Sequence, residues 1–417
     1  MRTTHTLIVG GGQAGLALSH CLTARRIDHV VVERGRLGER WRSERWESLR
    51  LLTPNWMTRL PGARYAGPDP DGFMTMGEVI SYLEAYAASF GAPVQPDTNV
   101  LAVRPAGDGF VVRTSRGDWR ARVVVVATGH CDTPHVPACA ARAPRRLQQV
   151  LPTRYRRPAD LPPGGVLVVG ASATGIQLAD EIHASGRPAV LAVGHHTRLP
   201  RQYRGRDILW WLDAMGVLDQ RLDQVADPHA SARQPSLQLV GRPRPQSLDL
   251  AVLHRRGVRL LGRLIDFDGD AACFDDDLIA TTAAADLKLA ALRLRIDAFI
   301  TERGLAGEVP APEPFEPTWP LGLDPATRLD LASAGVASVV WATGYVRRYP
   351  WLHVPVLDTH GEIRHAQGVT PWPGLFVLGL SFQRRRKSSF IDGVGEDAEF
   401  VAQHIARVPA GSGQVIA

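Results

Sequence analysis

A glycine-rich turn near the start of the chain is the feature that most constrains the fold. The spacing Gly10-x-Gly12-x-x-Gly15 follows a short apolar run at residues 7–9 and precedes a helix-forming segment. That segment repeats small and apolar residues at helical spacing: Ala14, Ala17, Leu18, Cys21 and Leu22. A second apolar run then ends at Glu33, about 20 residues after the first glycine. The order of strand, glycine turn, helix, strand and acidic residue predicts a dinucleotide-binding βαβ unit.

Each part of this motif has a physical role. Gly10 permits the tight turn, Gly12 lets a backbone amide approach a pyrophosphate, and Gly15 lets the helix pack closely against the strand. The start of the helix presents free N–H groups and the positive end of the helix dipole to the phosphates. Glu33 can accept hydrogen bonds from a ribose diol and would repel a 2′-phosphate.

The same pattern recurs in the middle of the chain. An apolar run at residues 166–169 leads into Gly170-Ala171-Ser172-Ala173-Thr174-Gly175, with Ser172 in place of the second glycine. The next apolar run, residues 190–193, ends without an acid and is followed by three cationic candidates: His195, Arg198 and Arg201. Because a cationic strand end suits a 2′-phosphate, this unit is expected to bind NADPH rather than NADH.

Composition excludes several other classes of function. The net charge of +6 comes almost entirely from scattered arginines, which favours a solvated surface over a nucleic-acid interface. The four cysteines form no C-x-x-C pair and no cluster with metal-ligand spacing, which argues against a disulfide framework, a zinc site and a dithiol redox centre. No charged-then-apolar leader precedes the first strand, and no apolar run approaches membrane-spanning length. We therefore expect a cytoplasmic protein that binds neither nucleic acid nor membrane.

Further motifs extend the pattern across most of the 417 residues. Residues 38–54 are dense in arginine and aromatic side chains, which suits a loop packed against a flat ligand. Thr75-x-x-Glu78 predicts a capping box at the start of a helix. Two buried strands are each followed by Ala-Thr-Gly, at residues 127–129 and 342–344. Residues 205–335 are the least informative part of the chain.

The combination resembles the class B flavin monooxygenases, a family of flavoproteins with two dinucleotide-binding domains. The residues that carry the resemblance are Gly10, Gly12, Gly15, Glu33, Gly38-x-x-Trp41, Leu49-Arg50-x-x-Thr53-Pro54, Ala127-Thr128-Gly129, Gly170-x-Ser172-x-x-Gly175, Ala342-Thr343-Gly344-Tyr345 and Leu378-Gly379. It implies an α/β fold of two Rossmann-like domains, with the NADPH-binding domain inserted in the FAD-binding domain. The expected FAD domain comprises residues 1–150 and 336–417, and the expected NADPH domain comprises residues 151–335 with a helical or lid segment at about 205–335.

The resemblance also implies the cofactor contacts. FAD is expected on the first unit, with Val100 meeting the adenine through its backbone, and NADPH on the second, while the two Ala-Thr-Gly segments border both cofactors. The residues expected at FAD are Gly10, Gly12, Gln13, Ala14, Gly15, Glu33, Arg34, Arg40, Trp41, Thr53, Val100, Ala127, Thr128, Gly129 and Gly379. Those expected at NADPH are Gly170, Ser172, Ala173, Thr174, Gly175, His195, Arg198, Arg201, Ala342, Thr343 and Gly344.

Two departures from the family pattern concern the oxygenation step. The fingerprint Phe-x-Gly-x-x-x-His is expected just before the second glycine turn, but residues 147–156 lack all three of its fixed residues; Leu151 or Pro152 aligns with the His. Leu52 stands where N-oxygenating members often place a polar residue beside the flavin. No catalytic residue is assigned, and the candidates nearest the flavin are Trp41, Leu52 and Thr53.

The resemblance implies an NADPH-consuming, FAD-dependent monooxygenase that inserts one oxygen atom of O2 into a small organic substrate through a C4a-(hydro)peroxyflavin. Two alternatives stay open. One is an NAD(P)H-dependent flavin oxidoreductase that passes electrons to another acceptor. The other is a non-catalytic flavoprotein that senses NADPH. The sequence leaves open the choice among N-, S- and ketone oxygenation, and whether the protein is a monomer or a homodimer.

Overall fold

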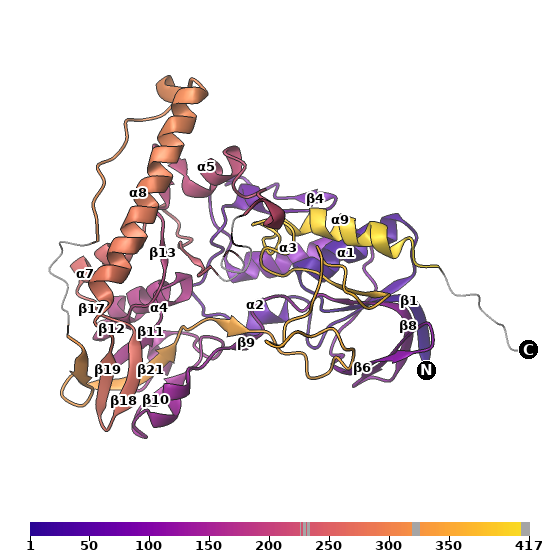
Figure 1. Ribbon diagram of the computed structural model, residues 1–417, viewed down its shortest axis with the longest axis horizontal. Coiled ribbons are helices and arrows are strands. Elements are labelled where there is room, and N and C mark those ends of the chain that lie inside the picture. The colour runs from indigo at the N-terminus through magenta and orange to yellow at the C-terminus, as the bar shows by residue number, and fades with distance from the viewer. Residues whose placement is uncertain (226, 228–230, 232–233, 319–325, 410–417) are drawn as a thin grey trace, which may run out of the picture.

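The computed structural model of the chain describes residues 1–225, 227, 231, 234–318 and 326–409. These residues form two modules side by side, each built on its own sheet (Figure 1). The chain leaves the first module once and returns once, so both ends of the sequence belong to the first module. This is the α/β arrangement with one domain inserted in another that the sequence predicts.

The sheet of the first module is organised around its strand β1. β1 pairs in parallel with β2 on one side and β8 on the other, so that Leu7 lies opposite Val30 and Val124. Both faces of this sheet are covered, which is why these strands read as continuous apolar runs rather than alternating ones. The seven strands are β1 (Arg2–Val9), β2 (His29–Val32), β5 (Val94–Gln95), β6 (Val100–Ala106), β7 (Gly109–Thr114), β8 (Trp119–Val126) and β23 (Leu375–Val377).

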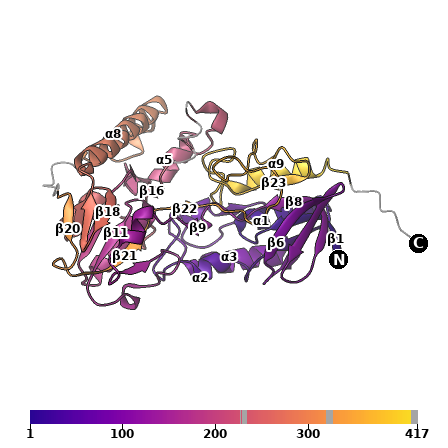
Figure 2. The same cartoon turned by 60° about the horizontal axis from the view of Figure 1, so that its bottom comes forward.

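Helices cover the first sheet and fix its glycine turn. The predicted capping box is confirmed at the start of α3: the Thr75 hydroxyl accepts a hydrogen bond from the Glu78 N–H, and the Glu78 carboxylate accepts one from the Thr75 N–H at 2.7 Å. α1 and α9 lie against each other over the sheet (Figure 1, Figure 2). The helices of this module are α1 (Gln13–Ala24), α2 (Glu39–Ser43), α3 (Met76–Ser89) and α9 (Val394–Ile405).

The sheet of the second module is entirely parallel, in the order β10-β21-β11-β12-β17. Its strands are β10 (Gln148–Val150), β11 (Gly165–Val169), β12 (Ala189–Ala192), β17 (Arg259–Leu261) and β21 (Val336–Trp341). β10 and β21 fall within the segments that the sequence assigned to the first domain. The boundaries expected at residues 150 and 336 are therefore wrong by several residues, because β10 pairs with β21 and β21 pairs with β11.

The two crossings between the modules are tied together. After β8 the chain passes through Ala127-Thr128-Gly129 into β9 (Thr133–Pro134), and after β21 it passes through Ala342-Thr343-Gly344 into β22 (Tyr345–Val346). β9 and β22 pair in antiparallel fashion, with Pro134 opposite Tyr345. The two Ala-Thr-Gly segments thus lie at the start of a shared two-stranded connection.

The helical or lid segment that the sequence expects at about residues 205–335 is called the lid below, and part of it packs around a core of its own. α5 (Ile208–Ala214) and α8 (Leu278–Glu302) enclose a separate apolar core around the fully buried Trp211, and Met57 of the first module joins this core. α4 (Ala173–Ala184) and α7 (Leu250–Arg256) cover the second sheet. The short strands are β3 (Arg59–Leu60), β4 (Ala63–Arg64), β13 (Thr197–Arg198), β14 (Gln202–Tyr203), β15 (Arg206–Asp207), β16 (Leu237–Gln238), β18 (Leu264–Asp268), β19 (Ala271–Phe274) and β20 (Arg328–Asp330). None of the described helices is long and apolar enough to cross a membrane.

Candidate functional site

The first glycine turn lies at the carboxyl end of β1 and has two glycines that packing requires. Gly10 has φ of 112°, and a Cβ there would lie 2.6 Å from the carbonyl oxygen of Ala127. A Cβ on Gly15 would overlap the carbonyl oxygen of Gly10. By contrast, a Cβ on Gly12 would meet nothing within 4 Å. Gly12 is the N-cap residue of α1, and no side chain there caps the first N–H groups of the helix. The amides at the start of α1 therefore face open space, which fits the binding of a phosphate group there.

Glu33 is held beside this turn by backbone amides. One carboxylate oxygen accepts the Gly11 N–H at 2.7 Å and the other accepts the Gly35 N–H at 3.1 Å. Each oxygen keeps a lone pair, so the half-buried carboxylate can still accept from a diol. Arg34, the next residue, is exposed and pairs with Glu44 at 2.8 Å.

Two other predicted residues reach this turn from distant parts of the chain. Gly379, after β23, has φ of 85°, and a Cβ there would lie 2.7 Å from the Cβ of Ala14. The Thr98 N–H donates to the carbonyl oxygen of Glu33 at 2.7 Å, which brings the start of β6, including the buried Val100, towards the acid. The surroundings of the first turn thus come from β1, β2, β8, β23 and the residues just before β6.

The second glycine turn repeats the construction of the first. Gly170 has φ of 106°, and a Cβ there would overlap the carbonyl oxygen of Ala342, the counterpart of Ala127. A Cβ on Gly175 would overlap the carbonyl oxygen of Gly170. Ser172 caps α4 without a side-chain hydrogen bond, and its backbone φ and ψ of −80° and −171° nearly equal those of Gly12, −80° and −172°. Ser172 therefore leaves the amides of Ala173 and Thr174 as open as those of the first turn.

The structure does not place Arg198 and Arg201 at an open phosphate site. The Arg198 guanidinium is buried and pairs with Asp249 at 2.8 Å and with Asp286 at 2.6 Å. The Arg201 guanidinium is 1% exposed, pairs with Asp207, and donates to the Leu52 carbonyl at 2.8 Å. The expectation that these two arginines bind a 2′-phosphate therefore needs correction, because buried carboxylates already neutralise both: two aspartates distant in the sequence pair with Arg198, and the nearby Asp207 pairs with Arg201.

One residue that sequence reasoning missed lies beside the end of β12. His195, predicted from the sequence to lie near a 2′-phosphate, is exposed there. A Cβ added to Gly194 would lie 4.0 Å from the Cγ of Arg263, which follows the neighbouring strand β17. The Arg263 side chain is 60% exposed and pairs with Asp275 at 2.8 Å on the surface. Only the parallel pairing of β12 with β17 could have revealed it, since about 70 residues separate the two strands.

α2 links the predicted flavin-side residues to the segment after β8. Arg40 donates to the Cys131 carbonyl and pairs with Asp132, while the Arg45 guanidinium lies 5.6 Å from the ring centre of Trp41. Leu52 and Thr53 lie further along the same loop and are half-buried. Arg40 thus contacts the residues that directly follow the first Ala-Thr-Gly segment, and Trp41 lies next to it on α2.

A histidine and a cysteine follow that segment directly. Burial alone would lower the pKa of His130 and raise that of Cys131, but their mutual charge interaction and hydrogen bond outweigh burial. The pKa of the imidazole is therefore raised and that of the thiol lowered, with Arg45 and Arg40 adding to the second effect. The pair favours an imidazolium and a thiolate. The sequence showed both residues but gave no sign of this coupling.

The segment that replaces the monooxygenase fingerprint has a structural role at the junction of the modules. Tyr155 is 2% exposed, and the Arg156 guanidinium donates to the carbonyl oxygens of Arg42 and Arg45 next to α2. Leu151 is half-buried and Pro152 is buried, so neither supplies a polar group in place of the expected histidine.

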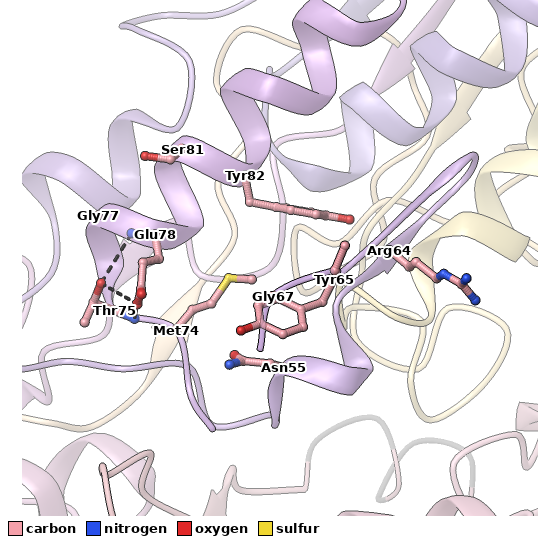
Figure 3. A pocket seen from close by; sticks show the side chains of 11 residues that line it. Asn55, Arg64, Tyr65, Gly67, Met74, Thr75, Gly77, Glu78, Ser81 and Tyr82 are labelled. Atoms are coloured by element: carbon pink, nitrogen blue, oxygen red, sulfur yellow. Dashed lines mark hydrogen bonds between the residues drawn. The ribbon is translucent and has the colours of Figure 1, made fainter. Parts of the chain in front are cut away.

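A hollow of about 640 Å³ lies between α3 and the loop around β3 and β4 (Figure 3). Tyr65 and Tyr82 lie over it from one side and Met74 from the other. The Asn55 side-chain oxygen is buried without a hydrogen-bond partner among the described residues. The Leu51 N–H donates to the Met74 carbonyl at 2.8 Å, which ties the wall of the hollow to the predicted flavin-side loop. Across the described residues, no group of His, Cys, Asp or Glu is arranged to hold a metal ion.

Comparison with known proteins agrees with this construction. Residues 7–215 match the pyridine nucleotide-disulphide oxidoreductase family. An uncharacterised CzcO-like oxidoreductase of Geobacillus kaustophilus is 32% identical over 403 residues, which cover 96% of this chain and 97% of that protein. Probable indole-3-pyruvate monooxygenase YUCCA1 of Arabidopsis thaliana is 27% identical over 205 residues, 48% of this chain and 49% of that protein. A flavin-containing monooxygenase from Stenotrophomonas maltophilia has the same fold, with a TM-score of 0.68, 17% identity and coverage of 97% and 99% of the two chains.

Proposed function

We propose that this chain, which belongs to the pyridine nucleotide-disulphide oxidoreductase family, is an FAD-dependent, NADPH-consuming monooxygenase of the class B type. The observation that carries the proposal is the pair of glycine turns of like construction, each closed by an Ala-Thr-Gly segment. Two such turns in one chain fit two dinucleotides. Residues of the first turn would hold FAD and residues of the second would hold NADPH, and the bound flavin would supply hydride acceptance from NADPH and electron transfer to O2.

The residues of the first turn fit FAD. The open amides at the start of α1 suit the pyrophosphate, and the lone pairs of Glu33 suit the ribose. The list of proposed FAD contacts is the one expected from the sequence: Gly10, Gly12, Gln13, Ala14, Gly15, Glu33, Arg34, Arg40, Trp41, Thr53, Val100, Ala127, Thr128, Gly129 and Gly379. Arg40, held by Cys131 and Asp132, and Trp41, packed against the Arg45 guanidinium, orient the flavin end of this site.

The residues of the second turn fit NADPH. The open amides of Ala173 and Thr174 suit its pyrophosphate. His195 and Arg263 border the end of β12, where the absence of an acid permits a 2′-phosphate. Arg198 and Arg201 instead hold the lid to the second module. The β9–β22 pair keeps the two cofactor sites in fixed relation, which hydride transfer between them requires.

The proposed substrate is a small organic molecule, and O2 is the second substrate. Leu52, the tyrosines of the neighbouring hollow and the buried apolar loop exclude water from the flavin side. A cytoplasmic location belongs to the same proposal.

Two matched substitutions test the cofactor assignments. Gly12→Asp and Ser172→Asp each place a carboxylate at a helix N-cap, a position where aspartate is favoured, so both variants are expected to fold. Gly12→Asp should abolish FAD binding. Ser172→Asp should still bind FAD, and dithionite should still reduce that FAD. The rate of reduction by NADPH should fall by about 100-fold, because the carboxylate repels the pyrophosphate. Equal reduction by NADPH in Ser172→Asp and the wild type would contradict the assignment of the second site.

Rapid mixing tests the oxygenation step. The FAD-loaded protein is reduced with NADPH without oxygen and mixed with aerated buffer while its visible spectrum is followed. A monooxygenase shows a species distinct from reduced and oxidised flavin that lasts seconds or longer. Direct return to oxidised flavin with stoichiometric hydrogen peroxide would favour the electron-transferring oxidoreductase, to which the missing fingerprint histidine also points. If NADPH does not reduce the flavin, the result would favour the remaining alternative, a non-catalytic flavoprotein that senses NADPH.

A further inference from the structure

The helix α8 is apolar on two opposite faces. One face, which includes Leu289, Ile296 and Ile300, is buried in the lid core. On the other face Leu287 and Leu294 are 73% and 71% exposed. A helix that is apolar all round is normally covered on all sides. α8 stands at the outer edge of the second module (Figure 1, Figure 2), so its outward face lacks a cover from the rest of the described chain.

The exposed residues follow a heptad. They are Ala280, Ala284, Leu287, Ala291, Leu294 and Ala298, and all six are exposed. Their spacing alternates between four and three residues over five steps, which is the a/d seam of a coiled coil. Leucine and alanine alternate along its central part, so the seam has large knobs beside places where another helix can approach closely.

We propose that this seam binds the same seam of a second copy of the chain, with the two helices antiparallel. When the two-fold axis passes at Leu289, Leu287 of each copy faces Ala291 of the other, and Leu294 of each faces Ala284 of the other. Ala280 then faces Ala298. In this register every leucine meets an alanine and all six seam residues are paired, so the seam is complementary to itself, as an isologous interface requires.

Charge favours this orientation over the parallel one. Three aspartates, Asp275, Asp276 and Asp277, lie at the start of α8, and the exposed Arg303 follows its last residue. Antiparallel pairing brings each acidic end to the level of Arg303 in the other copy and aligns the helix dipoles favourably. Parallel pairing would instead set acidic end against acidic end, and Arg295 against Arg295.

The size of the seam sets the expected affinity. From Ala280 to Ala298 it extends about 27 Å, at 1.5 Å per residue. With a width of about 10 Å, it buries less than the roughly 1,200–2,000 Å² of a standard interface. The structure therefore predicts a reversible dimer whose population depends on protein concentration. The dimer does not depend on the proposed function, because no cofactor-site residue lies on the seam.

Sedimentation equilibrium of the full chain, across a range of concentrations, tests the proposal. The wild type should show a monomer–dimer equilibrium. Leu287→Lys should raise the dissociation constant by about 100-fold or more, since it removes two buried leucines from a symmetric pair. Leu101→Lys, at a leucine 50% exposed on β6, is the matched control and should leave the equilibrium unchanged. A monomer at all concentrations, or a dimer insensitive to Leu287→Lys, overturns the proposal.

Disulfide trapping tests the register. In a background with both Cys131 and Cys273 replaced by serine, a mixture of the Leu287→Cys and Ala291→Cys proteins should cross-link between unlike copies under mild oxidation. Efficient cross-linking of Leu287→Cys with itself would indicate parallel helices and would overturn the antiparallel arrangement. Circular dichroism confirms that each variant is folded.

Discussion

Substitution of Arg198, at the centre of a buried ion-pair cluster, tests whether this residue stabilises the fold or binds NADPH. Its guanidinium contacts Asp249 and Asp286, and all three side chains are 11% exposed or less. Asp249 also caps α7 through the Val252 N–H, and Asp286 accepts from the Thr318 N–H at 2.6 Å. Arg198 therefore joins α7, α8 and the segment that returns from the lid.

Arg198→Ala leaves two carboxylates buried without their cation. Removal of one partner from a buried pair costs about 3–5 kcal/mol, so the melting temperature should fall by on the order of 10 °C for a module of this size. Arg198→Lys keeps the charge but loses the two-pronged contact, and an intermediate loss is expected. Thermal unfolding followed by circular dichroism gives the stability, and steady-state rates with NADPH and NADH give the cofactor preference.

Arg263→Ala is the control for the same measurements. Its exposed ion pair with Asp275 contributes about 1 kcal/mol or less, so stability should hardly change. The KM for NADPH should rise while that for NADH stays the same. A stable Arg198→Ala variant with a selective rise in the KM for NADPH would refute the assignment of Arg198 to the lid and return it to the phosphate site.

Three further predictions concern single groups. Iodoacetamide should alkylate Cys131 faster than it alkylates Cys139, because burial raises the pKa of the Cys139 thiol. The substitution His130→Asn should lower the alkylation rate of Cys131 by about tenfold at pH 7. Equal alkylation rates at both cysteines would show that no thiolate forms. Glu33→Ala should weaken FAD binding by about 10–100-fold in fluorescence titration, as expected for lost hydrogen bonds to a charged group, whereas Glu47→Ala, at the surface, should not; equal affinities would remove Glu33 from the site. Burial raises the pKa of Asp397 to about 6 despite Ser388 and Arg384, so its protonated form stabilises the fold at low pH and that contribution is lost as the pH rises towards 6. Asp397→Asn should therefore gain up to about 3 kcal/mol in free energy of unfolding relative to the wild type between pH 4 and pH 7, and a constant difference across that range would contradict the assigned pKa.

The sequence was informative where local backbone chemistry decides the structure. The strands around both glycine turns, the capping box at Thr75 and the two Ala-Thr-Gly crossings follow from short motifs whose geometry their own residues impose. The domain boundaries were less accurate, because β21 joins the second sheet only by its pairing with β11, and β10 joins it only by its pairing with β21. Pairing between strands so far apart in sequence has no local signal.

The phosphate-site cations show the same limit more sharply. Arg198 and Arg201 follow β12 where a Rossmann fold places its specificity residues, so position alone favoured them. The tertiary structure decides otherwise for Arg198, whose partners Asp249 and Asp286 come from the start of α7 and from α8. The partner of Arg201, Asp207, is only six residues away, and the sequence alone gave no sign that the two are buried together. Arg263 gained its place in the same way, through the pairing of β17 with β12. Local motifs specify the turn that holds a dinucleotide, whereas the charges that choose between dinucleotides depend on the tertiary structure.

The two glycine turns also explain why Ser172 is tolerated where the first turn has Gly12. At both turns the first and third glycines press against carbonyl oxygens of their own module, so a side chain there would break the packing. The middle position faces open space in the first turn, and Ser172 adopts the same backbone conformation in the second. Packing therefore requires glycine at the first and third positions of each turn. At the middle position, the approach of a ligand limits the size and charge of the side chain. A serine hydroxyl is compatible with a nearby phosphate, because it can donate a hydrogen bond, whereas a carboxylate is not. The substitution of Asp at either position thus probes the ligand with little disturbance of the fold.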